Sequence, residues 1–125
     1  LYAGPVIIVT TPESIERDPT RAGDLRRAGA ELEPIHGGDL AAAFERLGQR
    51  EIVSVVLEGG VELQTAAWKS GLVDGVHLYV APAALGDGSV PWLDTETLSI
   101  AALADRLVTP LGSDVFMEGY VHGID

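Results

Sequence analysis

The sequence contains no cysteine, which excludes disulfide bonds, a thiolate nucleophile and any cysteine-ligated metal. It is also poor in basic residues, with 8 Lys and Arg against 19 Asp and Glu and a formal net charge of -11. A non-specific nucleic-acid binder needs a Lys/Arg surface that displaces counterions from phosphates, so the charge argues against that class. The acidic excess serves solubility, although eight basic residues still suffice for one local anion pocket.

Long apolar runs are missing as well. None approaches the ~18 residues that a membrane helix needs, and the longest dense stretch, Ile52 to Leu57, has the length of a strand. No signal peptide is visible, so we expect a cytoplasmic protein with no membrane partner. The first residue is Leu1 rather than Met, and we therefore expect the chain to begin within a longer protein.

Short β-branched runs alternate with helical stretches along the 125 residues, whose composition is that of one globular domain. The expected strands are residues 6–10, 31–35, 52–57, 76–81 and 114–121, and the expected helices are residues 24–28, 40–47 and 61–70. Residues 98–108 fit either a short helix or a strand. The pattern predicts an α/β fold with a mixed, mainly parallel sheet flanked by helices and with antiparallel strands at its C-terminal end.

Glu58-Gly59-Gly60 follows the most apolar expected strand and precedes an expected helix. In open α/β sheets, ligands bind outside the carboxyl ends of the strands. Glycines allow close approach of a ligand, and the first N–H groups of the helix form an anion site, for which a phosphate or pyrophosphate is the natural guest. The alternative is that the glycines only make a tight turn. Glu58 fits either a hydrogen bond to a polar heterocycle or a cap on its own turn.

Several motifs then occur in order at characteristic spacings. They are Val55-Val56-Leu57-Glu58-Gly59-Gly60, Gly71-Leu72-Val73-Asp74, Leu78-Tyr79-Val80-Ala81-Pro82 with Leu85-Gly86, Leu111-Gly112-Ser113-Asp114-Val115, and Glu118-Gly119-Tyr120-Val121. From about Pro5 to Val121 the sequence resembles the RibD C-terminal domain family, the pyrimidine reductases of riboflavin biosynthesis, which have a dihydrofolate-reductase-like fold. This resemblance implies a single reductase domain over residues 1–125.

The resemblance also implies a function: NADPH-dependent reduction of the 5-amino-6-(5-phosphoribosylamino)uracil type, with a ribosylamino-pyrimidine as substrate. In the family, the residue that matches Glu58 contacts the substrate. The matching cofactor-binding residues are Gly59, Gly60, Val61, Glu62, Leu63, Gln64, Thr65 and Ala66. Family members commonly form homodimers through the C-terminal part of the sheet, so we expect a homodimer.

Two departures from the family pattern matter. Val61-Glu62 stands where the family typically has Pro-Thr, and a carboxylate cannot donate a hydrogen bond to a phosphate. If Glu62 faced a phosphate about 6 Å away, the repulsion would be roughly 3 kcal/mol at an effective dielectric near 20. If it faces solvent, it suits the helix N-terminus by about 0.3–1 kcal/mol. The family's first strands and most of its substrate contacts are not visible in the sequence, so we expect this chain alone to be inactive. The alternative is a non-catalytic dimerisation or nucleotide-binding module of the same fold.

The remaining candidate residues carry weaker signals. The three histidines have no ligand spacing, so we expect no metal site. The three arginines could contact a 2′-phosphate, although a solvated helix face is commoner, and the two threonines could contact the adenosine end of the cofactor. The two aspartates could be a catalytic pair and the two tryptophans could stack on a ring, while turn, capping and packing roles are commoner for them. These candidates are His36, His77, His122, Asp74, Asp114, Trp68, Trp92, Arg21, Arg26, Arg27, Thr10 and Thr11.

Overall fold

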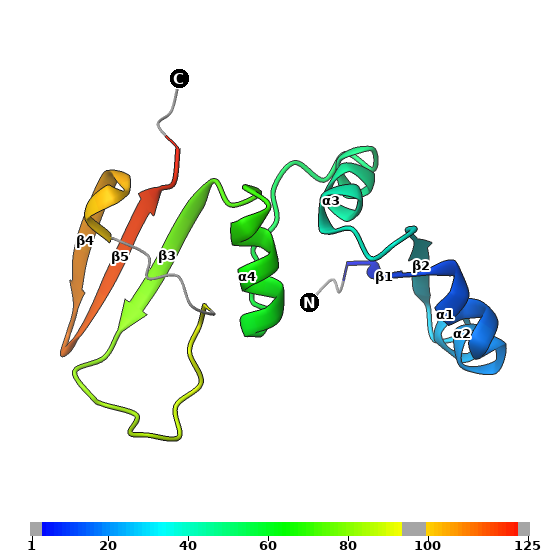
Figure 1. Ribbon diagram of the computed structural model, residues 1–125, viewed down its shortest axis with the longest axis horizontal. Coiled ribbons are helices and arrows are strands. Elements are labelled where there is room, and N and C mark those ends of the chain that lie inside the picture. The colour runs from blue at the N-terminus through cyan, green and yellow to red at the C-terminus, as the bar shows by residue number, and fades with distance from the viewer. Residues whose placement is uncertain (1–3, 94–99, 123–125) are drawn as a thin grey trace. The chain divides into compact units, whose positions relative to one another are not determined.

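The computed structural model describes residues 4–93 and 100–122 (Figure 1). They fall into two compact units, residues 1–55 and residues 56–125, which are described separately below. The chain forms β1 (Val6–Thr10), α1 (Pro12–Arg17), α2 (Pro19–Arg27), β2 (Ala30–Pro34), α3 (Leu40–Gly48), α4 (Val61–Lys69), β3 (Gly75–Val80), a 3₁₀ helix (Ile100–Ala102), β4 (Ala104–Leu111) and β5 (Asp114–Tyr120). This is the mixed α/β fold expected, with a parallel strand pair flanked by helices and antiparallel C-terminal strands.

In the first unit, β1 and β2 pair in parallel, from Val6 opposite Ala30 to Thr10 opposite Pro34. Two helices connect them, where the sequence pattern had predicted only one short helix at residues 24–28. Thr11 caps α1 by accepting a hydrogen bond from the Ser14 N–H at 3.2 Å, and Asp18 caps α2 in the same way. A proline follows each cap at the first helical position, where its missing N–H costs nothing. These two cap-proline pairs were the sequence signal for both helices.

An ion-pair network joins β2 to α3. Glu33 on β2 is buried, and its carboxylate accepts hydrogen bonds from Arg46 Nε at 2.6 Å and from Arg50 Nη1 at 3.3 Å. Arg50 also pairs with Glu31. The hydrogen bond from Arg46, with the charges of Arg46 and Arg50, holds the pKa of Glu33 below its ordinary value, although desolvation opposes this shift. These ion pairs therefore connect α3 and the residues after it to β2. Asp39 caps α3, accepting from the Ala41 N–H at 2.9 Å.

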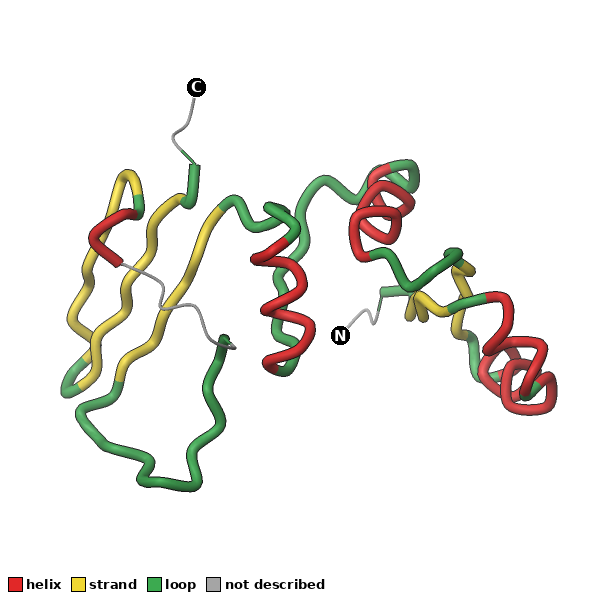
Figure 2. The backbone as a smooth tube through the Cα atoms, in the orientation of Figure 1, coloured by secondary structure: helices red, strands yellow, loops and turns green. Residues whose placement is uncertain are grey.

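The segment from Ile52 to Leu57 does not form the strand that its sequence predicts. Residues 52–60 are neither helix nor strand, and the segment is drawn as a loop between α3 and α4 (Figure 2). Val53 is 97% exposed and Val56 81% exposed. A parallel strand needs a neighbour that satisfies its backbone N–H and C=O groups. In the described ranges, the five strands pair only among themselves, so the apolar pattern is present but no strand pairs with it.

In the second unit, β5 lies between β3 and β4 in an antiparallel sheet (Figure 2). Tyr79 on β3 is opposite Phe116 on β5, which is opposite Thr109 on β4. Residues 98–108, which fitted either element, contain the 3₁₀ helix and the start of β4 within their described part. The predicted antiparallel C-terminal strands are confirmed, and β4 and β5 form a hairpin with Leu111 opposite Asp114 across a two-residue turn.

A β-bulge in β4 lies against Gly119. The register shifts between Ala104 and Leu107, and Asp105 has a left-handed φ of 47°. A Cβ atom on the buried Gly119 would lie 2.9 Å from Leu103 Cβ and 3.2 Å from the Ala104 carbonyl oxygen. The glycine therefore provides the space into which the bulged strand packs.

We expect Glu33→Gln to lower the thermal stability at pH 7, because a neutral amide cannot replace a carboxylate held by two arginines. Since the folded pKa of Glu33 is lowered, its stabilisation is complete above the ordinary glutamate pKa of about 4.3 and is lost as the pH falls through the folded pKa. Melting curves from pH 7 to pH 3 should show the gap between variant and parent narrowing. The matched control is Glu45→Gln on the exposed face of α3, which should change little. An equal effect of both variants at all pH values would contradict the role of the network.

We expect Gly119→Ala to destabilise the protein by about 1–3 kcal/mol, because the added methyl group overpacks the contact with the bulge. Urea unfolding measures this change. Gly88→Ala is the control, since a Cβ there has nothing within 4 Å and the φ of Gly88 is not left-handed. It should stay within about 0.5 kcal/mol of the parent. A neutral Gly119→Ala variant would show that the bulge adjusts freely.

Candidate functional site

The N-terminus of α4 has unsatisfied backbone donors. Gly60 is its N-cap residue, with φ -71° and ψ 175°, and no side chain caps the helix there. The first helical hydrogen bond runs from the Gln64 N–H to the Gly60 carbonyl at 3.1 Å. The preceding N–H groups, of Val61, Glu62 and Leu63, therefore have no acceptor within the helix. Together with the helix dipole, they make this end of α4 attractive to an anion.

The two glycines before α4 have different roles. A Cβ on the half-buried Gly59 would lie 2.6 Å from Leu63 Cδ2 and 3.0 Å from Leu63 Cβ, so any larger residue here would have to displace Leu63. A Cβ on Gly60 would meet nothing within 4 Å, and its φ suits any residue. The tight-turn explanation thus accounts for Gly59 alone. A Cβ on Gly60 would have room, so the turn itself does not require glycine there.

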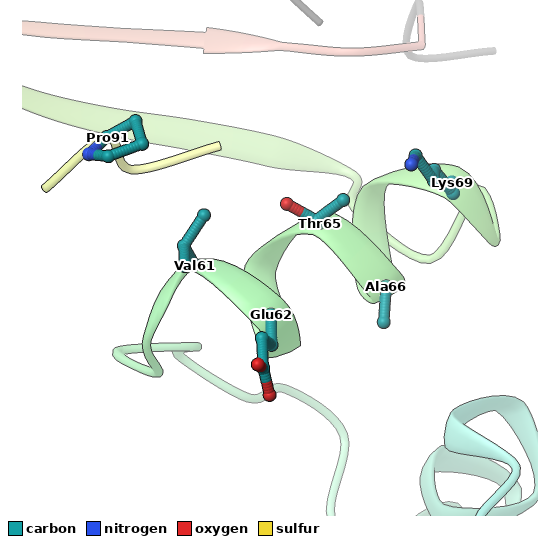
Figure 3. A pocket seen from close by; sticks show the side chains of 6 residues that line it. All are labelled: Val61, Glu62, Thr65, Ala66, Lys69 and Pro91. Atoms are coloured by element: carbon teal, nitrogen blue, oxygen red, sulfur yellow. The ribbon is translucent and has the colours of Figure 1, made fainter. Parts of the chain in front are cut away.

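A cavity of about 500 Å³ runs along α4 (Figure 3). Val61 and Thr65 carry their side chains on the side of the helix toward Pro91. Its lining residues are Val61, Glu62, Thr65, Ala66, Lys69 and Pro91. Four of these belong to the predicted cofactor-binding stretch, whereas Lys69 and Pro91 were not predicted. Lys69 lies one turn beyond Thr65, but Pro91 reaches the cavity through a long loop that no local sequence signal places.

Glu62 is exposed, and its side chain lies with Ala66 on the side of α4 away from Pro91 (Figure 3). In this orientation the carboxylate suits the positive end of the helix dipole. Glu62 also lines the cavity with Val61 and Thr65, so a ligand there would lie near the carboxylate.

The other predicted cofactor residues lie on the same helix. Leu63 is partly exposed and packs on Gly59, Gln64 is half-buried, and Thr65 is only 8% exposed. Glu58, the predicted substrate-binding residue, lies two positions before the N-cap with its side chain exposed. The predicted residues therefore form one continuous stretch at the beginning of α4.

Several weaker candidates have local structural partners. The Thr11 hydroxyl caps α1 and donates to Ser14 Oγ at 3.1 Å. Arg27 pairs with Asp24 in its own helix. His77 lies 3.6 Å from Glu118 and packs edge-to-face on Phe116 at 5.5 Å between ring centroids. Across residues 4–93 and 100–122, no three His, Asp or Glu side chains gather as metal ligands would.

No helix in the described ranges combines the length and the apolar character needed to cross a bilayer.

Comparison with known proteins gives consistent matches. The model of a family described as RibD C-terminal domain matches residues 2–117. The riboflavin biosynthesis protein RibD of Aquifex aeolicus (strain VF5) is 27% identical over 124 residues, which cover 93% of this chain and 32% of the relative. The protein of the same name from Actinobacillus pleuropneumoniae is 44% identical over 48 residues, covering 38% of this chain and 13% of the relative.

A solved structure, form 2 of Acinetobacter baumannii RibD, has a TM-score of 0.66 at 21% identity and supports the fold. The match covers 91% of this chain and 36% of that structure. The chain therefore spans about a third of the length of this structure and of the Aquifex aeolicus relative. Because the family model matches nearly the whole sequence, the chain belongs to the RibD C-terminal domain family, a family of riboflavin-biosynthesis reductases.

Proposed function

We propose that the beginning of α4 binds the phosphates of NADPH, and that the native protein reduces a ribosylamino-pyrimidine phosphate of the 5-amino-6-(5-phosphoribosylamino)uracil type. The observation that carries the proposal is the uncapped N-terminus of α4 beside open space at Gly60 and a cavity of about 500 Å³. Membership of the reductase family supports NADPH as the cofactor. The relatives are named for riboflavin biosynthesis, which supports a pyrimidine substrate.

The residues present fit a dinucleotide. The N–H groups of Val61, Glu62 and Leu63 would hold the pyrophosphate, as helix N-termini do in other nucleotide sites. Gly59 fixes the turn that presents these groups, and Gly60 leaves room for the phosphate oxygens. When bound, NADPH supplies the hydride, so the protein needs no nucleophile of its own. The protein binds and orients both reactants.

Glu58 is the proposed substrate contact. Its exposed carboxylate precedes the phosphate-binding turn by two residues, and an ionised carboxylate accepts hydrogen bonds only. The N–H groups of an aminopyrimidine are suitable donors. This placement would hold the substrate next to the cofactor.

The test uses the native full-length protein, with NADPH and the ribosylamino-pyrimidine phosphate as substrates. We expect substrate-dependent loss of the nicotinamide absorbance, and we expect Glu58→Gln to lower kcat/KM by about tenfold to a hundredfold, the loss of one charge-assisted hydrogen bond. Thermal unfolding of the same variant should be unchanged. A protein that neither binds NADPH nor consumes it would overturn the proposal, and a large loss of stability in Glu58→Gln would make Glu58 a structural cap.

Gly60→Ala and Gly59→Ala separate binding from folding. We expect Gly60→Ala to fold normally, because its Cβ meets nothing within 4 Å. We expect it to weaken NADP⁺ binding, because the added methyl group lies at the N-cap of α4, next to the free N–H groups. Gly59→Ala should lose about 1–3 kcal/mol of stability through the clash with Leu63. Calorimetric titration and urea unfolding measure the two effects. Unchanged NADP⁺ affinity in Gly60→Ala would rule out this turn as the phosphate site.

The second candidate function is a non-catalytic dimerisation or nucleotide-binding module, with a second copy of the chain as partner. The exposed apolar residues of the antiparallel sheet favour it: Tyr79 is 74% exposed, Leu107 53% and Val108 57%. A homodimer through this sheet is compatible with either function. The two functions differ in turnover, since a module would bind nucleotide or dimerise without consuming NADPH.

A further inference from the structure

The sequence contains two Asp-Gly pairs, Asp74-Gly75 and Asp87-Gly88, and no asparagine. The peptide bond after an aspartate is most open to attack on the side chain where glycine follows, because glycine rotates freely and has no Cβ beside its nitrogen. The two pairs lie in different settings. Asp74-Gly75 is at the start of β3, whereas Asp87-Gly88 is in the loop that follows β3 (Figure 2).

Asp87-Gly88 forms the tip of a tight turn. The Ser89 N–H donates to the Gly86 carbonyl at 3.1 Å, which closes a four-residue turn with Asp87 and Gly88 at its centre. No other backbone hydrogen bond joins two residues of the range 81–93, and this range contains neither helix nor strand. The turn can therefore open with the loss of a single hydrogen bond.

Both reacting groups of this pair are free. Asp87 and Gly88 are exposed, and a Cβ on Gly88 would meet nothing within 4 Å. In the part of the chain that the structure describes, the Asp87 carboxylate makes no hydrogen bond or ion pair, and the Gly88 N–H has no acceptor. The Asp87 carboxyl carbon and the Gly88 nitrogen can thus approach each other without displacing a neighbour.

We propose that Asp87-Gly88 is a site of spontaneous isomerisation, at which the aspartate becomes β-linked isoaspartate. The Gly88 nitrogen forms a bond to Cγ of the protonated Asp87 side chain, and the Cγ hydroxyl leaves with the amide proton as water. This closes a five-membered succinimide ring. Water then adds to one ring carbonyl and breaks its bond to nitrogen: breakage at Cγ restores aspartate, and breakage at the main-chain carbonyl gives isoaspartate. One water is released and one is taken up, so no other reactant is needed.

The product differs from the parent in ways that a partner can recognise. Isoaspartate adds one carbon to the main chain and carries a free α-carboxylate, which the exposed turn presents to solvent. That carboxylate is the group that an isoaspartate carboxyl methyltransferase modifies, so an enzyme of this class is the partner that the isomerised chain fits. The inference is independent of the proposed function, because no cofactor or substrate takes part.

The pair at the start of β3 is an internal control. The Asp74 carbonyl accepts a hydrogen bond from the Val121 N–H at 2.8 Å, and Gly75 is opposite Tyr120 in the antiparallel pairing. A Cβ on Gly75 would lie 3.5 Å from the Gly119 carbonyl oxygen, so the neighbouring strand is close. Closing a succinimide ring here requires backbone rotation that would break the end of the strand pairing. We therefore expect the fold to protect Asp74 and not Asp87.

The experiment incubates the native full-length protein at neutral pH in water labelled with the heavy oxygen isotope. Each ring opening then places one heavy oxygen at the reacting aspartate. Chymotrypsin cleavage after Tyr79 separates the two pairs into different peptides for mass spectrometry, and a purified isoaspartate carboxyl methyltransferase detects the isomer. The same protein in guanidinium chloride gives the rates of the unfolded chain.

We expect Asp87 to incorporate label nearly as fast in the folded protein as in the denatured one. Asp74 should be slower by about tenfold or more on folding, since each ~1.4 kcal/mol needed to open the strand pairing lowers the rate tenfold. Gly88→Ala should slow the reaction at Asp87 several-fold, because its methyl group hinders the attacking nitrogen, and Asp87→Glu should abolish it. Both variants should melt at the parent's temperature, since these side chains contact nothing in the described ranges.

Three results would overturn the proposal. One is an Asp87 peptide without label or isoaspartate. Another is folding that protects Asp87 as strongly as Asp74, which would show that the turn does not open. The third is an unchanged rate in Gly88→Ala, which would show that the Gly88 nitrogen is not the attacking group.

Discussion

The unsatisfied N–H groups at the beginning of α4 are the constraint on which the site depends. Their geometry requires an acceptor, and no side chain of the protein caps them. The whole chain carries a formal net charge of -11, which disfavours an anionic ligand at long range. Such repulsion is screened beyond ~8 Å at physiological ionic strength, so the nearest groups decide the affinity. A few fixed amide dipoles can therefore bind a phosphate on an acidic protein.

The packing of both units leaves much apolar surface uncovered. The buried hydrophobic residues of the described part are mostly small, being Ala22, Ala43, Ala67, Val76, Leu93 and Leu103. In the antiparallel sheet, exposed residues lie on both faces, since Tyr79 belongs to one face and its neighbour Val80 to the other. A sheet with one solvated face alternates apolar and polar residues, and this sheet does not. Its composition is that of a layer covered on both sides, which is consistent with the proposed dimer.

Local sequence signals predicted most of the fold. The predicted strands near residues 6–10, 31–35, 76–81 and 114–121 are all present, because their patterns depend on neighbouring residues. The predicted strand at residues 52–57 is wrong for this structure. An apolar pattern indicates which faces will be buried, but a strand forms only where a partner strand is available.

The cofactor-binding role of residues 59–66 stays a prediction. What the structure shows is that this stretch forms one helix and its preceding turn, as the motif around Gly59 and Gly60 indicates. Pro91 could not be predicted, because the path of the loop after β3 brings it to the helix. Lys69 lies outside the recognisable motif, and only the helical geometry shows that it shares a cavity with Val61 and Thr65.

The departure at Glu62 changes the side chains at the beginning of α4 but not its backbone donors. Adjacent helical positions point about 100° apart, so Val61 and Glu62 point to different sides of α4. Both still line the cavity, so the carboxylate belongs to its surroundings. In the first turn a carboxylate contributes about 0.3–1 kcal/mol through the helix dipole. Among the residues only proline lacks a backbone N–H, so Val61-Glu62 in place of the family's Pro-Thr pair removes no donor from this end of the helix.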